Sequence, residues 1–188
     1  MYGAVSLLDE PTNQLVKDIW QRLEDKCGLK GVRIFPVPHF SWIVAPAVDV
    51  DVANRKLMEL GKHLPPLLVR ASGLGVFSGP SPVIYIALVN DSAMQAYHHQ
   101  IWEAIHPLTT SPVPYYAPGI WMPHITLAYG DVTPANLPCA LSELCFECFS
   151  RVIHVDTLAL VSQEGQEVGD MEASYCMCGT SPLKGQAL

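Results

Sequence analysis

Two short motifs in this chain each place a hydroxyl residue two positions after a histidine. They are His-Phe-Ser-Trp at 39–42 and His-Ile-Thr-Leu at 124–127. Histidine, whose ordinary pKa is about 6.5, can both donate and accept a proton near neutral pH. Two histidines at one site would therefore supply a general acid and a general base. Cleavage of a phosphodiester needs that pair, because one group takes a proton from the attacking oxygen while the other protonates the departing oxygen.

Both motifs lie in segments whose alternating apolar residues predict β-strands. Side chains two residues apart on a strand point to the same face, so His39 and Ser41 would share one face. The same holds for His124 and Thr126. If the two strands are neighbours, the four polar groups converge on the floor of one cleft. The hydroxyls would then donate hydrogen bonds to phosphate oxygens, where charge builds up in the transition state, and the scheme requires neither metal nor cofactor.

The remaining pattern predicts an α+β domain. Expected strands are 2–8, 34–44, 67–73, 83–89, 121–129, 149–161 and 173–179, and expected helices run from Pro11 to near Gly28, 52–64, 92–105 and 134–144. The proline-rich stretch 109–119 is expected to be extended on the surface, and the polar stretch 163–170 to resemble a hairpin. Both halves repeat a histidine-bearing strand, a break and a helix. We therefore expect one internally duplicated domain of two lobes over 1–188.

The two motifs, together with the segment WMPHITLAYG at 121–130, resemble those of the 2H phosphoesterase superfamily. That group includes 2'-5' RNA ligase-like proteins and RNA 2',3'-cyclic phosphodiesterases. The resemblance covers most of the chain and implies two lobes of antiparallel sheet with outer helices around a central cleft. It implies that His39 donates a proton to the leaving oxygen and that His124 accepts one from water. It also implies that Ser41 and Thr126 hold the phosphate.

On these grounds we expect a metal-independent phosphodiesterase that hydrolyses 2',3'-cyclic phosphates of RNA ends or small nucleotides. Reversible 2'-5' RNA ligation is expected of the same site, because the reverse of ring opening uses the same two histidines with exchanged roles. The alternative is a noncatalytic module that binds an RNA terminus or a nucleotide in the same cleft. Titratable imidazoles favour the enzyme, since a pure phosphate binder would use the stronger Arg or Lys.

Aromatic side chains near the second motif could stack on a base of the substrate. The candidates follow the proline-rich loop or lie on a predicted strand: Tyr115, Tyr116, Trp121 and Tyr85. Packing of the loop against the core is the competing explanation. Arg70 and Arg151 are further candidates, because either could reach the cleft and neutralise phosphate charge.

A metal site is the less favoured interpretation. No carboxylate or third histidine stands at ligand spacing beside His39 or His124. Zinc accepts four thiolates, and the chain offers Cys145, Cys148, Cys176 and Cys178. We instead expect these four to be buried free thiols. The remaining histidines are expected to be solvated or to cap helices: His63, His98, His99, His106 and His154.

The composition of the chain limits the classes of binding partner and the cellular location that we expect. The chain has 188 residues, 11 basic and 18 acidic side chains, and a net charge of −7. Binding to duplex DNA or to an anionic membrane is therefore not expected, and small or terminal substrates are favoured. The apolar stretches are shorter than the roughly 18 residues that span a bilayer, and the start lacks a basic leader region. We expect a cytoplasmic monomer whose six cysteines are reduced.

Overall fold

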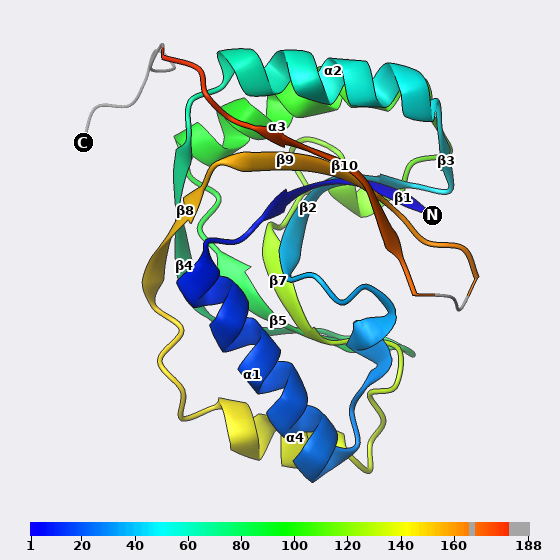
Figure 1. Cartoon of the computed structure of the whole chain (residues 1–188). Helices are drawn as coiled ribbons and strands as arrows, with labels where there is room; N and C mark the ends of the chain where they lie inside the picture. Colours follow the sequence, from blue (N-terminus) through cyan, green and yellow to red (C-terminus); the bar gives the residue numbers. More distant parts are fainter. Residues whose placement is uncertain (166–167, 181–188) are drawn as a thin grey trace.

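A computed structural model describes residues 1–165 and 168–180 and shows an α+β architecture with two antiparallel sheets (Figure 1). The first sheet has the order β10-β9-β1-β2 and consists of β1 (Tyr2–Leu7), β2 (His39–Ala45), β9 (Thr157–Ser162) and β10 (Asp170–Cys176). The second has the order β7-β5-β4-β8 and consists of β4 (Leu67–Phe77), β5 (Val83–Leu88), β7 (His124–Ala128) and β8 (Arg151–Val155). Each motif strand is thus an edge strand.

Helices cover one face of each sheet. They are α1 (Glu10–Cys27), α2 (Val50–His63), α3 (Ser92–Ile105) and α4 (Leu137–Leu144). In Figure 1, α2 and α3 lie above the first sheet, and α1 and α4 lie below the second. Three of the helices begin at an aspartate whose carboxylate accepts a backbone N–H of the first turn: Asp9, Asp49 and Asp91. No described helix is both long and apolar enough to cross a membrane.

Shorter elements complete the described chain. Strand β3 (Ala47–Val48) pairs with β6 (Thr109–Thr110) in a small separate sheet. Three 3-10 helices occur, η1 (Gly31–Ile34), η2 (His106–Leu108) and η3 (Pro114–Tyr116). The predicted extended loop 109–119 is therefore partly structured. The predicted hairpin at 163–170 lies partly outside the described residues.

The two sheets do not correspond to the two halves of the sequence. Helix α1 follows β1 of the first sheet but packs against β7 and α4 of the second layer. Near the C-terminal end, β8 belongs to the second sheet and β9 to the first, with Asp156 between them. The single strand predicted over 149–161 is therefore wrong, because the chain changes sheets there. The α+β prediction itself is confirmed, while β2 begins at His39 and not at residue 34.

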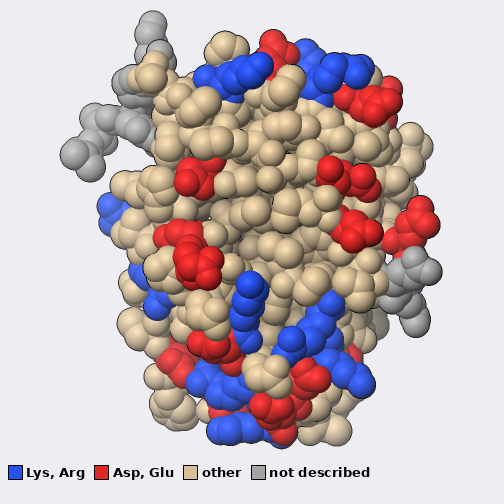
Figure 2. All heavy atoms as spheres, viewed as in Figure 1, with Lys and Arg blue, Asp and Glu red and all other residues tan. Residues whose placement is uncertain are grey.

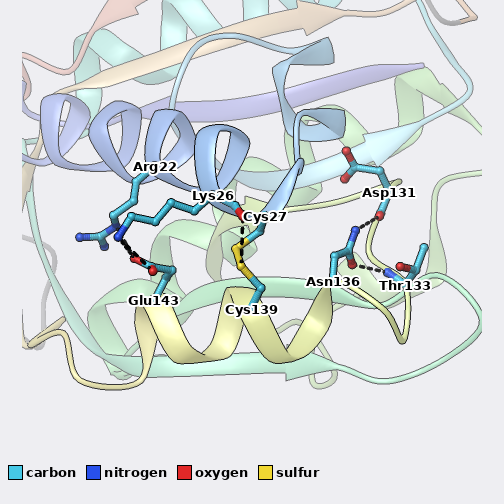
Figure 3. The surroundings of a disulfide bond; sticks show 8 residues. All are labelled: Arg22, Lys26, Cys27, Asp131, Thr133, Asn136, Cys139 and Glu143. Carbon is cyan, nitrogen blue, oxygen red and sulfur yellow. Dashed lines mark hydrogen bonds and ion pairs between the residues drawn. A yellow bond between two sulfur atoms is a disulfide. The ribbon is translucent and has the colours of Figure 1, made fainter.

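The expectation that all six cysteines are reduced is also wrong for one pair. Cys27, at the end of α1, and Cys139, in α4, form a disulfide with their Cα atoms 5.7 Å apart (Figure 3). Ion pairs from Lys26 and Arg22 to Glu143 join the same two helices. The two cysteines are 112 positions apart, so only the packing of α1 on α4 brings them together. Figure 2 shows the mixed charges that gather over these helices, in the lower part of the view.

The four other cysteines are exposed free thiols, not the buried ones expected: Cys145, Cys148, Cys176 and Cys178. Zinc would need them to converge. Within residues 1–165 and 168–180, no group of three or more His, Cys, Asp or Glu residues could hold a metal ion. The two cysteine pairs lie after α4 and at the end of β10, on different layers. The described residues therefore offer no site for the four-thiolate zinc alternative.

Candidate active site

The two histidine motifs meet along the facing edges of the two sheets. β2 ends the first sheet and β7 ends the second, and the two strands are in contact without a shared ladder (Figure 1). The two motif strands are therefore neighbours in space, although they belong to different sheets. In both strands the histidine and hydroxyl residues are half-buried and alternate with buried residues. This alternation puts the four polar side chains on the faces that the helices leave uncovered.

Each histidine ring is oriented by the same kind of hydrogen bond, to the backbone carbonyl two residues earlier. His39 Nδ1 lies 2.7 Å from the carbonyl oxygen of Val37, and His124 Nδ1 lies 2.7 Å from that of Met122. A carbonyl oxygen can only accept, so Nδ1 carries a hydrogen in both rings. In the neutral imidazole this leaves Nε2 as the unprotonated nitrogen. Both neutral rings are thereby fixed in the tautomer that can accept a proton at Nε2. Once protonated, each ring can donate that proton again from Nε2.

Burial sets the proton affinity of the pair. Desolvation lowers the pKa of His39 below 6.5 although the Val37 carbonyl raises it, and the nearby His124 lowers it further. Desolvation likewise lowers the pKa of His124, against the effect of the Met122 carbonyl. The two rings belong to strands β2 and β7, which are in contact. Near neutral pH the free site therefore holds predominantly neutral imidazoles, ready to accept a proton.

Two tryptophan indole N–H groups donate hydrogen bonds to backbone carbonyls of the motif strands. Trp20 of α1 donates from Nε1 to the carbonyl oxygen of Thr126 at 3.1 Å. Trp121, just before β7, donates from Nε1 to the carbonyl oxygen of Ser41, also at 3.1 Å. The backbone of each hydroxyl residue is thus anchored by a tryptophan. These bonds use carbonyls that an edge strand would leave unpaired, and they fix the strand edges against each other.

The surroundings of His39 are apolar. In the strand register Leu7 lies opposite His39, and Val5 lies opposite Ser41. The ring of Phe35 meets the His39 ring edge-on with centroids 5.0 Å apart. Phe35 also packs against a small cluster of buried aliphatic residues on this face, which includes Val5. This enclosure explains why desolvation dominates the pKa of His39.

The surroundings of His124 are aromatic. Tyr85 lies opposite Thr126 in the register and is tilted against the His124 ring at 5.2 Å. Phe77 stacks on Tyr85 at 4.1 Å and meets His124 edge-on at 4.9 Å. A Cβ at Gly75 would lie 2.4 Å from the Tyr85 ring, so the glycine makes room for it. Tyr85 is 6% exposed, and its contacts position His124.

Trp121, expected as a stacking partner for a base, is buried in the core. It is 4% exposed, and its ring stacks on His98 at 4.0 Å and on Trp42 at 5.3 Å. That expectation is therefore corrected, because no open ring face remains. His98, expected to be solvated or a cap, is likewise buried at 3% exposure, and its Nε2 lies 3.0 Å from the Tyr116 carbonyl oxygen. It ties the proline-rich loop to the core.

The loop tyrosines differ from each other. Tyr115 is 78% exposed, so its ring is open to a ligand. Tyr116 is half-buried, and its phenol lies near the Ser41 side chain. Burial raises the pKa of Tyr116 and the Ser41 contact partly opposes this, so the phenol stays protonated at neutral pH. Tyr116 therefore belongs to the surroundings of Ser41.

Three residues of the site were not anticipated from the sequence: Trp20, Phe35 and Phe77. Trp20 looks like an ordinary buried residue on the apolar face of a helix. Phe35 and Phe77 stand next to a loop and at a strand end, where no local pattern marks them. Their roles depend on strand register and on α1 crossing to the second sheet. Arg70 and Arg151, by contrast, line a groove of their own on the second sheet.

Comparisons with known proteins identify the family and the fold. A family model described as the 2'-5' RNA ligase superfamily matches residues 10–167, a range that includes both motifs. Among solved structures, the chain is similar to TT0787 of Thermus thermophilus, with a TM-score of 0.65 and 16% identity over 96% of this chain and 99% of that chain. At this identity the likeness shows the fold alone. No curated protein matched the chain in a sequence search.

Proposed function

Because the chain belongs to the 2'-5' RNA ligase superfamily, we propose that it hydrolyses 2',3'-cyclic phosphates of RNA ends or small nucleotides by two-histidine acid–base catalysis without a metal ion. The observation that carries the proposal is the matched pair of imidazoles. Each has its Nδ1–H bonded to a backbone carbonyl and its Nε2 left for proton transfer. A phosphate binder gains nothing from two such tautomers, whereas proton transfer depends on them.

The reaction balances with the groups present. A water oxygen adds to phosphorus while one histidine takes its proton, and a P–O bond of the ring breaks while the other histidine protonates the departing ribose oxygen. The hydroxyls of Ser41 and Thr126 donate to the nonbridging oxygens, where charge accumulates. With the 5'-hydroxyl of a second RNA end in place of water, the same steps with the same roles join the two ends through a 2'-5' linkage when the 3' oxygen departs. Cleavage of that linkage back to the cyclic phosphate is the reverse reaction, in which the histidines exchange roles.

We further propose that His39 is the proton donor in hydrolysis and His124 the acceptor, which is the order that the family resemblance implies. Both rings leave Nε2 for proton transfer, and desolvation lowers the pKa of both.

The test is hydrolysis of 2',3'-cyclic nucleotides and of an RNA with a cyclic phosphate end, in the presence of EDTA. We expect turnover by the wild-type protein and a loss of about 10²–10⁴-fold in His39→Ala and in His124→Ala. His63→Ala is the matched control, because His63 is exposed at the end of α2. Unfolding midpoints of all variants establish that they fold. Wild-type turnover that survives in both variants, or no turnover on any substrate, would refute the proposal.

A further inference from the structure

The phosphate site at the two histidines has no cationic side chain among its described neighbours. Aliphatic residues and Phe35 surround His39, and Tyr85 and Phe77 surround His124. Burial, a backbone carbonyl at each ring and the effect of His124 on His39 set the pKa values of the pair. No Lys, Arg, Asp or Glu of residues 1–165 and 168–180 contributes to either pKa. The charge of a bound phosphate is therefore not compensated by a permanent cation from these residues.

The described basic residues stand elsewhere. Six of them belong to the outer helices α1 and α2, and Figure 2 shows basic side chains over both. In η1, Arg33 is paired with Glu24 of α1 at 2.6 Å, and Lys30 is exposed between α1 and η1. Arg70 on β4 and Arg151 on β8 are two and three strands from β7, which puts them about 10 Å or more across the sheet from the second motif.

Neutral donors bind the two charge states of a phosphate unequally. The hydroxyls of Ser41 and Thr126 and the phenol of Tyr116 can donate hydrogen bonds but carry no positive charge. The motif side chains are half-buried. Removal of an anion from water costs more free energy as its charge rises, and a paired cation is what offsets that cost. A half-buried site with neutral donors therefore favours a monoanion over a dianion.

Opening of the ring changes the charge of the phosphate. A 2',3'-cyclic phosphate is a diester and carries one negative charge. Of the two hydrogens of the attacking water, one reaches the departing ribose oxygen and the other stays on the new P–OH group. That group ionises with a pKa of about 6, so the monoester product is predominantly a dianion above pH 7. Substrate and product thus differ by one negative charge.

We propose that this site, where no described side chain supplies a permanent positive charge, binds phosphodiester monoanions and excludes phosphomonoester dianions, its own product included. The inference rests on the proposed function and extends it, because it names the charge state of the ligand that the site accepts. RNA ends that carry a 2'- or 3'-phosphomonoester are then poor ligands at neutral pH, whereas cyclic ends are good ones. The selection weakens toward pH 6, because the monoester becomes a monoanion there.

Binding of two ligands that differ by one charge tests the selection without any need for turnover. They are a 2'-deoxynucleoside 3'-phosphate and its methyl ester, which stays a monoanion. In titration calorimetry at pH 8 we expect the methyl ester to bind about 10- to 100-fold more tightly, and at pH 6 the two affinities should agree within about threefold. Equal affinities at pH 8, tighter binding of the monoester, or no binding of either ligand would overturn the proposal.

A cation placed beside the site should remove the selection. Met122 is 56% exposed and lies two residues before His124. In Met122→Lys we expect the affinity for the monoester at pH 8 to rise about tenfold or more. Met58→Lys adds the same charge at an exposed position of α2 and is the matched control. An unchanged preference in Met122→Lys, or an equal gain in Met58→Lys, would also contradict the proposal.

These outcomes separate the selection from the proposed hydrolysis. Preferential binding of the methyl ester without turnover of any cyclic phosphate would refute the chemistry and leave the selection in place. Turnover of a cyclic phosphate together with equal binding of the two ligands would refute the selection and leave the chemistry in place. Unfolding midpoints establish that both lysine variants fold.

Discussion

The two halves of the candidate site hold their histidines alike but surround them differently. In both, Nδ1 donates to a carbonyl two residues earlier at 2.7 Å, and an indole N–H binds the carbonyl of the hydroxyl residue at 3.1 Å. Around His39 the neighbours are aliphatic residues and Phe35, whereas around His124 they are Tyr85 and Phe77. The shared hydrogen bond to a backbone carbonyl fixes the tautomer in both halves, and in both halves desolvation by the surroundings lowers the pKa of the histidine.

The helix layers behind the two sheets differ as well. A disulfide and the ion pairs of Glu143 join α1 to α4 behind the sheet of His124. Behind the sheet of His39, α2 packs against α3, and the described residues contain no disulfide there. One layer is thus held covalently and the other by packing. The site lies where the two meet, so its geometry depends on both.

Removal of one histidine at a time should show which half supplies the proton, and this is the largest effect we expect. On a phosphodiester with a 4-nitrophenyl leaving group, which departs without protonation, His124→Ala should lose about 10³-fold, while His39→Ala should stay within about tenfold of wild type. On a cyclic phosphate both should lose about 10³-fold. Steady-state rates on the two substrates give the answer. The opposite pattern would make His124 the donor.

Reduction of the disulfide should weaken the α1–α4 layer alone. Opening a loop of 112 residues is expected to cost up to about 5 kcal/mol in the free energy of unfolding. Urea unfolding with and without a phosphine reductant measures this. Hydrogen exchange should rise more in α1 and α4 than in α2 and α3. The free energy of unfolding of Cys27→Ser/Cys139→Ser should equal that of the reduced wild-type protein and should not change when the reductant is added. Equal stability of oxidised and reduced wild type would contradict the prediction.

Loss of single hydroxyl groups should give the smallest effects and distinguish the two halves. Ser41→Ala and Thr126→Val should each lower kcat by about 10²-fold, because each removes one donor to the phosphate. Tyr116→Phe should cost about fivefold, the value of one neutral hydrogen bond. In the Ser41→Ala background that further loss should vanish, since the two groups act together. Thr126→Val is the control background, in which Tyr116→Phe should still lower kcat about fivefold. An equal fivefold loss in the Ser41→Ala background would show that Tyr116 acts independently of Ser41.

Local patterns were sufficient for several parts of the fold. Apolar periodicity indicated all four helices, and alternation placed both motifs on strands, because these features depend on neighbours a few residues away. The same locality explains the errors. A continuous strand over 149–161 fits the alternation, but the break at Asp156 sends its two parts to different sheets. Nothing within a few residues records which sheet a strand joins.

By itself, the sequence determined the class of fold and predicted the chemistry. The spacing of apolar residues specifies α+β, and the two His-x-hydroxyl motifs predict an acid, a base and two donors. The tertiary structure alone decided that the motif strands face each other as sheet edges, and that Trp20 supports Thr126 from α1. It also decided that Cys27 meets Cys139 and that Trp121 is buried. These outcomes depend on residues far apart in the chain, and their pairing follows from packing and register that no local pattern encodes.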